Sequence, residues 1–281
     1  MLTPVCPDTT SARRFAHEAA LAALAELRPE RLPVDASQLA RQWDIPIIAR
    51  TYATPDTLGA LEDLGNGCYR IAVALPSPPI QRMFTIAHEL GHFCMTDHAT
   101  VLHPIPGLWH RSLLELGAAD CYDYQADFFA DALLVPTRLC RGLVGRLDAE
   151  QHGLHSVLAL ATACRVPLVS AARRYPEMTN RAAATVLSRG GRIIDALLSP
   201  VLCKRLGCAS GSLLRGQRLP ACTPRPKHVK RVRAHTHTRW TTQRDVSWNS
   251  WFSGLCGLTE ETCHWAGRHD ALLTILVETT P

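Results

Sequence analysis

The sequence predicts an α+β protein with a mainly helical N-terminal part that contains a small antiparallel sheet, a helical middle segment and a C-terminal α/β part. Three observations predict this class: helical patterns prevail up to about residue 180, strand-like runs follow, and 281 residues exceed the usual size of one domain. Hydrophobic residues make up 47% and charged residues 20%. This ordinary composition excludes disorder, collagen-like repeats and a coiled coil as descriptions of the whole chain.

The first 75 residues predict two helices and three strands. An Ala-rich helix is expected at residues 11–27, and a second helix, for which Asp35 and Ser37 offer N-caps, is expected to end near Trp43. Two of the strands are expected to form a hairpin because Gly65-Asn66-Gly67 lies between them. The expected strands are residues 45–52, 58–62 and 68–75.

The middle of the chain predicts helices, and its end predicts strands. A helix from Gln81 to about Thr96 precedes an irregular linker that extends through residue 110. A further helix runs from about Ala118 to Leu134, because its apolar residues repeat at helical spacing. Short helices continue to about Tyr175. Strands are expected at residues 183–188, 192–198, 246–252 and 271–277.

These patterns divide the chain into three expected parts, residues 1–136, 137–180 and 181–281. The net charge of +5 is unevenly distributed: residues 1–200 hold 18 lysines and arginines against 20 acidic residues, whereas residues 201–281 hold 12 against 5. No acidic residue lies between Asp195 and Asp245. The basic stretch, residues 204–244, is expected either to hold nucleic acid or an acidic partner, or to form a solvated face of the last domain.

The cysteines and the lack of membrane signals predict a cytoplasmic protein. The eleven cysteines form no CxxC pair, and most lie in apolar helical sequence, where a thiol behaves as a small hydrophobic group. The N-terminal Ala/Leu stretch is interrupted by His17, Glu18 and Glu26, so an amphipathic helix is expected there and not a signal peptide. No apolar run approaches about 18 residues, and no membrane span is expected.

The sharpest motif is His88-Glu89-Leu90-Gly91-His92, an HExxH pattern within a helical stretch. Histidines four residues apart project from the same face of a helix, so both imidazoles can ligate one Zn²⁺ ion. Zinc lowers the pKa of a bound water towards ~7, and Glu89 is placed to take the proton of that water and pass it to a leaving amine. One zinc ion per chain is expected.

A third ligand is expected on the helix at residues 118–134. Asp123 shares the apolar face of that helix, where a carboxylate is costly unless it is paired with a cation or a metal. We therefore predict Asp123 as the third zinc ligand. Asp127, one turn further on, is expected to accept a hydrogen bond from the free ring nitrogen of a ligating histidine. The competing interpretation is that either aspartate caps a helix or faces solvent.

Two segments together carry a resemblance to a known family. Residues 82–92 read Arg-Met-Phe-Thr-Ile-Ala-His-Glu-Leu-Gly-His, and residues 126–136 read Ala-Asp-Phe-Phe-Ala-Asp-Ala-Leu-Leu-Val-Pro. This pair resembles the motifs of the ImmA/IrrE family of zinc metallopeptidases, and the resemblance extends over residues 30–175. It implies a gluzincin-like, zincin-fold peptidase domain that cleaves helix-turn-helix repressors, in stress response or in the derepression of mobile elements. It also implies a C-terminal extension, which in some members is GAF-like.

The chain departs from the family at two positions. In the family a glutamate ahead of the second motif ligates zinc and another glutamate follows two residues later, whereas this chain has Asp123 and Gln125. Because aspartate is one methylene shorter, its helix must approach the metal more closely. The main expectation is an active zinc endopeptidase. The alternatives are a weakened or inactive homologue that acts as a DNA- or protein-binding regulator, and a last domain that senses a signal and gates the peptidase.

Further candidates lie outside these motifs. His98, His103 and His110 follow the HExxH helix, where one of them would stabilise a tetrahedral oxyanion; the alternative is a solvated loop histidine. Residues 159–175 have the cadence of a helix-turn-helix, with Arg173 and Arg174 on the second helix. This segment is expected either to recognise DNA or, as the similar helical segment of the family favours, to pack against other helices.

Overall fold

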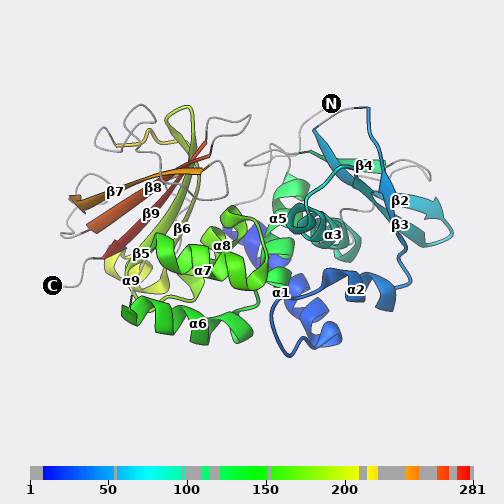
Figure 1. Ribbon diagram of the computed structural model, residues 1–281, viewed down its shortest axis with the longest axis horizontal. Helices are drawn as coiled ribbons and strands as arrows, with labels where there is room; N and C mark the ends of the chain where they lie inside the picture. The colour runs from blue at the N-terminus through cyan, green and yellow to red at the C-terminus, as the bar shows by residue number, and fades with distance from the viewer. Residues whose placement is uncertain are drawn as a thin grey trace. The chain divides into compact units, whose positions relative to one another are not determined.

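The protein is described from a computed structural model, which confirms the mixed α+β class (Figure 1). The structure describes residues 9–53, 56–95, 98, 109–113, 121–150, 153–208, 214–220, 238–246, 258–265 and 271–278. Contacts divide the chain into two compact units. Unit 1 comprises residues 1–139 and 161–170, and unit 2 comprises residues 140–160 and 171–281. The helical segment 137–180 is thus shared between the two units.

The helices of unit 1 form close to where the sequence predicts them. They are α1 (Thr9–Leu27), α2 (Ala36–Gln42), α3 (Pro79–Cys94) and α5 (Cys121–Leu134). The side chain of Asp35 caps α2 by accepting a hydrogen bond from the amide of Ser37 (3.0 Å), which satisfies a donor that the helix itself leaves unpaired.

Helix α1 packs on α5 through a stripe of small residues. The stripe consists of Ala12, Ala16, Ala20 and Ala23, which are all buried. Beside it, the Arg13 guanidinium donates a hydrogen bond to the Tyr124 hydroxyl (2.9 Å) and lies 4.9 Å from the centre of the Phe128 ring. The alanines allow the two helices to approach closely. The arginine, stacked on the Phe128 ring, favours one alignment of α1 along α5.

The sheet of unit 1 has four strands in the order β1-β3-β2-β4. They are β1 (Ile47–Arg50), β2 (Thr57–Gly65), β3 (Cys68–Ala74) and β4 (Trp109–Leu113). β1 runs parallel to β3, and the other neighbours are antiparallel. The predicted hairpin is confirmed: Asn66 and Gly67 connect β2 to β3 with φ angles of 55° and 75°, as a two-residue turn of type I′ requires. β4 lies in the region that the sequence predicts as an irregular linker, and it pairs with β2.

In the described part of unit 2, four helical segments precede a five-stranded sheet. The helical segments that belong to it in whole or in part are α6 (Thr137–Glu150), α7 (Leu154–Cys164), α8 (Leu168–Arg174) and the 3₁₀ turn Tyr175–Glu177. No single helix among the described residues is both long and apolar enough to cross a membrane, although one bent pair, Leu154–Cys164 with Leu168–Glu177, meets the requirement of length and composition.

The sheet of unit 2 is antiparallel throughout, with the order β6-β5-β9-β8-β7. Its strands are β5 (Ala183–Arg189), β6 (Arg192–Leu198), β7 (Thr238–Val246), β8 (Leu258–Trp265) and β9 (Ala271–Glu278). The predictions for β5, β6 and β9 are confirmed. The strand expected at residues 246–252 shares only Val246 with β7, which begins earlier, at Thr238; residues 247–252 lie outside the described part of the chain. β8 is a strand that the sequence did not predict, and it is held between β7 and β9.

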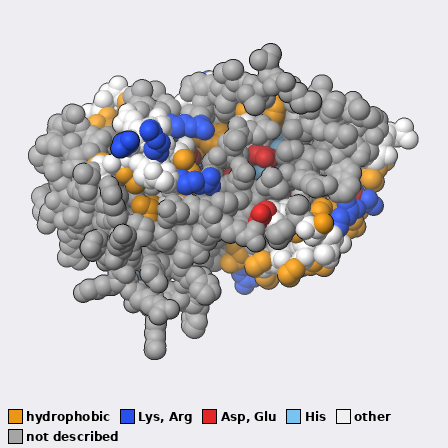
Figure 2. All heavy atoms as spheres, turned by 90° about the horizontal axis from the view of Figure 1, so that it is seen from above, with side chains coloured by type: hydrophobic (Ala, Val, Ile, Leu, Met, Phe, Trp, Pro, Cys, Tyr) orange, Lys and Arg blue, Asp and Glu red, His pale blue; other side chains and the backbone are white. Residues whose placement is uncertain are grey.

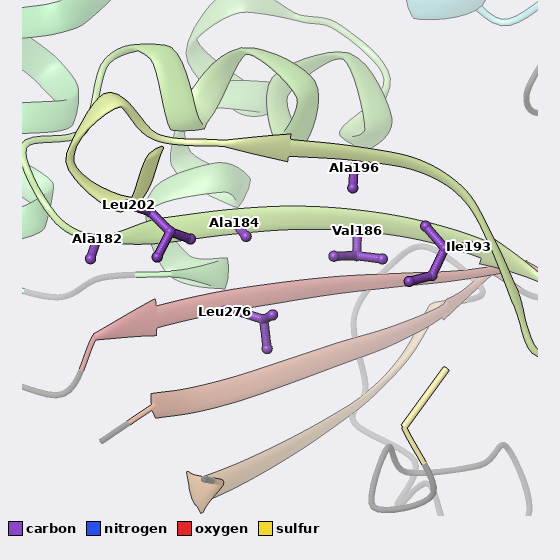
Figure 3. Close-up of a cluster of buried hydrophobic side chains, with 7 residues drawn as sticks. All are labelled: Ala182, Ala184, Val186, Ile193, Ala196, Leu202 and Leu276. Carbon is purple, nitrogen blue, oxygen red and sulfur yellow. The ribbon is translucent and has the colours of Figure 1, made fainter. Parts of the chain in front are cut away.

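One face of this sheet carries a cluster of buried apolar side chains, drawn in Figure 3. The cluster takes the residue just before β5, alternate residues of β5, and members of β6, β9 and the short helix α9 (Pro200–Leu206): Ala182, Ala184, Val186, Ile193, Ala196, Leu202 and Leu276. Within β5 only every second residue joins the cluster, because successive side chains of a strand point to opposite faces of the sheet. The Ser199 side chain caps α9 by accepting from the amide of Leu202 (3.2 Å), and this cap fixes the helix that brings Leu202 to the sheet.

The carboxylate of Asp148 links the helices of unit 2. It is buried, and it accepts hydrogen bonds from the hydroxyl groups of Tyr175 (3.0 Å), Ser156 (3.2 Å) and Thr179. The backbone carbonyl of Asp148 also accepts from the Arg181 guanidinium (3.2 Å). A single buried anion therefore holds α6, α7 and the segment that leads into β5.

We predict that Asp148→Ala destabilises unit 2 by about 2–4 kcal/mol, because three buried hydroxyl groups lose their acceptor. Tyr175→Phe removes one donor and leaves the carboxylate with the others, so its cost is expected to be about 1 kcal/mol. Chemical denaturation of both variants measures the difference. Equal costs for the two variants would contradict a shared acceptor.

Candidate metal centre

Helix α3 presents the two histidines of the HExxH motif. It begins with Pro79 at its first turn, and it packs against β2, β3 and α5. His88 and His92 are buried, and their Nε2 atoms lie 3.1 Å apart. Two imidazole nitrogens at this distance share a proton or face a common cation, because two lone pairs would otherwise repel each other.

Asp123 completes a triangle of donor atoms. It lies in the first turn of α5, where the helix dipole favours a carboxylate. Its Oδ1 atom lies 3.2 Å from Nε2 of His92 and 3.6 Å from Nε2 of His88. Ligands that each lie about 2.0–2.1 Å from a tetrahedral zinc ion are ~3.3–3.4 Å apart. The three sides of the triangle, 3.1, 3.2 and 3.6 Å, therefore fit one zinc ion with a fourth position open.

The short aspartate reaches the histidines because α3 and α5 are almost in contact. A Cβ atom added at Gly91 would lie 3.2 Å from Cα of Ala126 and 3.1 Å from Cδ1 of Phe129. Because Gly91 and Ala126 are both small, the two helices can lie this close together. The expectation that an aspartate ligand demands a closer approach of its helix agrees with this packing.

Carboxylates surround His88. Its Nδ1 atom lies 3.0 Å from Oδ1 of Asp127, the contact expected of a group that orients a ligand. Burial by itself lowers the pKa of His88, but the hydrogen bonds to Asp123 and Asp127 and the charges of Asp127 and Glu89 outweigh it. The pKa of His88 in the metal-free chain is therefore raised well above its usual value. The site attracts positive charge, whether a proton or a metal ion.

Glu89 lies on the same helix, fully buried, where strand β2 passes closest to α3. A Cβ atom at Gly59 of β2 would lie 3.2 Å from Oε1 of Glu89 and 2.5 Å from Cγ2 of Thr85. Gly59 is the residue that leaves room for the carboxylate between the sheet and the helix. A side chain at this position would clash with Thr85 and with the backbone carbonyl of Ala72 (2.9 Å), and it would crowd Glu89.

His98 is the functional residue whose environment the sequence did not predict. It is buried, its Nδ1 atom lies 2.9 Å from Nδ1 of His92, and its Nε2 atom lies 2.7 Å from Oε1 of Gln125. It is therefore not a solvated loop histidine, and it contacts the side of the His92 ring that faces away from the triangle, which is not an oxyanion position. The only signal in the sequence is its distance of six residues from His92. His103 and the side chain of His110 lie outside the described part of the chain.

The arginines of the helix-turn-helix-like segment are buried. Arg173 and Arg174 are 4% and 3% exposed. Arg173 lies 3.9 Å from Asp195, and Arg174 forms an ion pair with Glu177. The expectation that these arginines read DNA is thus contradicted for this conformation, and the alternative expectation, packing within the fold, fits them.

Three comparisons with known proteins bear on the chain. Residues 40–175 match the model of the peptidase family M78, described as the IrrE N-terminal-like domain. This range includes all of α3 and α5. Among solved structures the chain is similar to a Mycobacterium tuberculosis transcriptional regulator, with 14% sequence identity and a TM-score of 0.55; the similarity covers 96% of this chain and 80% of that chain. At this identity the likeness concerns the fold alone. No curated protein matches the sequence.

We predict that Gly91→Ala weakens zinc binding by about tenfold or more, because the added methyl group forces α3 and α5 apart and withdraws the short Asp123 side chain. The double variant Gly91→Ala with Asp123→Glu is expected to recover part of the affinity, since the extra methylene spans the wider gap. Competition with a chromophoric zinc chelator measures both. A loss in the single variant that the longer carboxylate leaves unchanged would contradict the geometric explanation.

We further predict that zinc binding weakens as the pH falls, because a proton and zinc compete for His88. The raised pKa of His88 means that this competition begins at a higher pH than for an ordinary histidine. Below that pKa the apparent dissociation constant is expected to rise about tenfold per pH unit for this one proton, and above it the contribution of His88 disappears. Titrations from about pH 5 to about pH 9 test this, and a flat profile would contradict it.

Proposed function

Since residues 40–175 belong to the IrrE N-terminal-like domain family, as the paired motifs predicted, we propose that the protein is a zinc-dependent endopeptidase. The observation that carries this proposal is the triangle of His88, His92 and Asp123, with Glu89 next to it on the same helix. The family supports a metallopeptidase, and the triangle supports zinc as its metal. The reaction is the hydrolysis of a peptide bond in a protein substrate.

The proposed mechanism assigns one task to each side chain. Zinc at this site supplies a Lewis acid that lowers the pKa of water and polarises the scissile carbonyl. His88, His92 and Asp123 hold the metal through Nε2, Nε2 and Oδ1. Glu89 accepts a proton from the attacking water and passes it to the nitrogen of the leaving amine. Asp127 accepts a hydrogen bond from Nδ1 of His88 and so keeps its Nε2 free for the metal.

The proposed substrate is a helix-turn-helix transcriptional repressor, and its cleavage would relieve repression in a stress response or of a mobile element. The family resemblance supports this substrate, and the structural neighbour described as a transcriptional regulator supports a role in regulation. Cleavage of a repressor is a cytoplasmic activity. As part of this proposal we assign unit 1 to the zincin-like fold, because α3 packs beside a mainly antiparallel sheet. We assign unit 2 to the GAF-like fold, because its sheet is antiparallel throughout.

A regulatory role without catalysis is the second candidate, favoured by the basic stretch at residues 204–244. Figure 2 shows several Lys and Arg side chains gathered on the left of the face that it displays. Among the described residues of the stretch, Arg205 forms an ion pair with Glu278, so its charge is balanced within unit 2. Binding of an acidic partner would rest on the remaining charges of the stretch and would fall steeply with rising salt.

We predict that Glu89→Gln retains zinc but lowers cleavage of a helix-turn-helix repressor by about 10²–10⁴-fold, because the amide cannot accept the proton. Glu18→Gln, on the exposed surface of α1, is the matched control and is expected to cleave at the wild-type rate. Gel analysis of the repressor incubated with each zinc-loaded protein, and with a chelator, measures the rates. Equal cleavage by wild type and Glu89→Gln would exclude the mechanism, and no cleavage by wild type would favour the regulatory role.

A further inference from the structure

We propose that His98 and Gln125 form a neutral hydrogen-bonded chain that positions the metal ligand His92 and fixes its tautomer. This inference rests on the proposed function, since it assigns His92 to zinc. The chain runs from Nδ1 of His92 to Nδ1 of His98 (2.9 Å), and from Nε2 of His98 to Oε1 of Gln125 (2.7 Å).

The direction of each hydrogen bond follows from the metal ligand. A histidine that ligates zinc through Nε2 carries its proton on Nδ1 and therefore donates from there. His98 must then accept at its own Nδ1 and carry its proton on Nε2. Oε1 of Gln125 accepts the hydrogen bond from this N–H group, and the NH₂ group of Gln125 points the other way. The opposite tautomer of His98 would place two N–H groups face to face at 2.9 Å.

The amide orientation of Gln125 has a second support. Its Nε2 atom donates to Sγ of Cys121 (3.7 Å), one turn earlier on α5. The ring of His98 also packs edge-on against the ring of Tyr122, with 4.9 Å between the ring centres. His92, His98, Gln125 and Cys121 are all buried. A buried polar group keeps one orientation when each of its hydrogen-bonding neighbours is itself held in place. The hydrogen-bonded chain of His98 and Gln125 therefore holds the His92 ring in a single orientation.

The two histidine ligands are thus supported in different ways. Asp127, a carboxylate, accepts from His88, whereas a neutral imidazole followed by a neutral amide accepts from His92. Glu89, Asp123 and Asp127 already place three carboxylates near one ion. A neutral acceptor behind His92 orients this ligand without a fourth negative charge, which would be costly in so buried a position.

The experiment compares zinc affinities by competition with a chromophoric chelator, using full-length folded protein throughout. His98→Phe fills the space of the ring without an acceptor, and it is expected to weaken zinc binding by about 10–100-fold. At Gln125 a matched pair separates acceptor from packing. Gln125→Leu removes the acceptor and is expected to weaken binding by about fivefold or more, whereas Gln125→Glu retains an acceptor and is expected to bind zinc more tightly than Gln125→Leu but, because of the added buried charge, less tightly than wild type.

A second measurement needs no variant. Long-range ¹H–¹⁵N correlation spectra of the zinc-loaded wild-type chain report which ring nitrogens carry protons. The proposal requires His98 to be protonated on Nε2 and unprotonated on Nδ1. A His98 proton on Nδ1, or zinc affinity in His98→Phe within about twofold of wild type, would overturn it. Failure of the wild-type chain to bind zinc would instead overturn the proposed function, so the two failures are distinct.

Discussion

The close contact of α3 with α5 is the constraint on which the site depends. Gly91 of α3 faces Ala126 and Phe129 of α5 so closely that a methyl group on the glycine would have to push them back by a few tenths of an ångström. At this separation the short side chain of Asp123 reaches the two imidazoles. Helix packing and metal coordination therefore depend on each other. The small residues bring the two backbones together, and this separation determines how long a carboxylate side chain must be to reach the metal.

Charge balance explains why so many polar groups are tolerated inside unit 1. Glu89 and His92 are fully buried, and His88 is nearly so. Without a cation, the carboxylates raise the pKa of His88 and retain a proton there. A zinc ion would replace that proton as the positive charge, and it would accept the lone pairs of both histidines and of Asp123. Because a buried ionised group is costly unless it is paired, the three donor atoms favour a metal-bound fold over an empty one.

The sequence was informative where local periodicity decides the structure. The HExxH helix and the turn at Asn66-Gly67 follow from spacings of a few residues, and the place of Asp123 on the apolar face of its own helix predicted that it has a cationic partner. Strands β4 and β8 could not be predicted, because their residues do not alternate between apolar and polar, and long-range pairing with β2 and β9 stabilises them. The same holds for Arg173 and Arg174, whose charges suggest a surface position although both side chains are buried, Arg173 near the buried Asp195 and Arg174 paired with Glu177. The position of His98 could not be predicted, because it depends on the path of the chain after α3, which no periodicity of the sequence encodes.

Helix α5 supports both histidine ligands from one short segment. At 3.6 residues per turn, Asp123 and Asp127 lie on one flank of the Ala126 contact, and Cys121 and Gln125 lie on the other. The first flank carries Asp123, which faces both histidines, and Asp127, the partner of His88; the second carries Gln125, which contacts His98 on the far side of His92. A rotation of α5 by one residue, about 100°, would remove all of these contacts together. The register of α5 against α3 therefore sets the positions of Asp123, Asp127 and Gln125 relative to the histidines in a single step, and the close Gly91–Ala126 contact is part of the packing that holds this register.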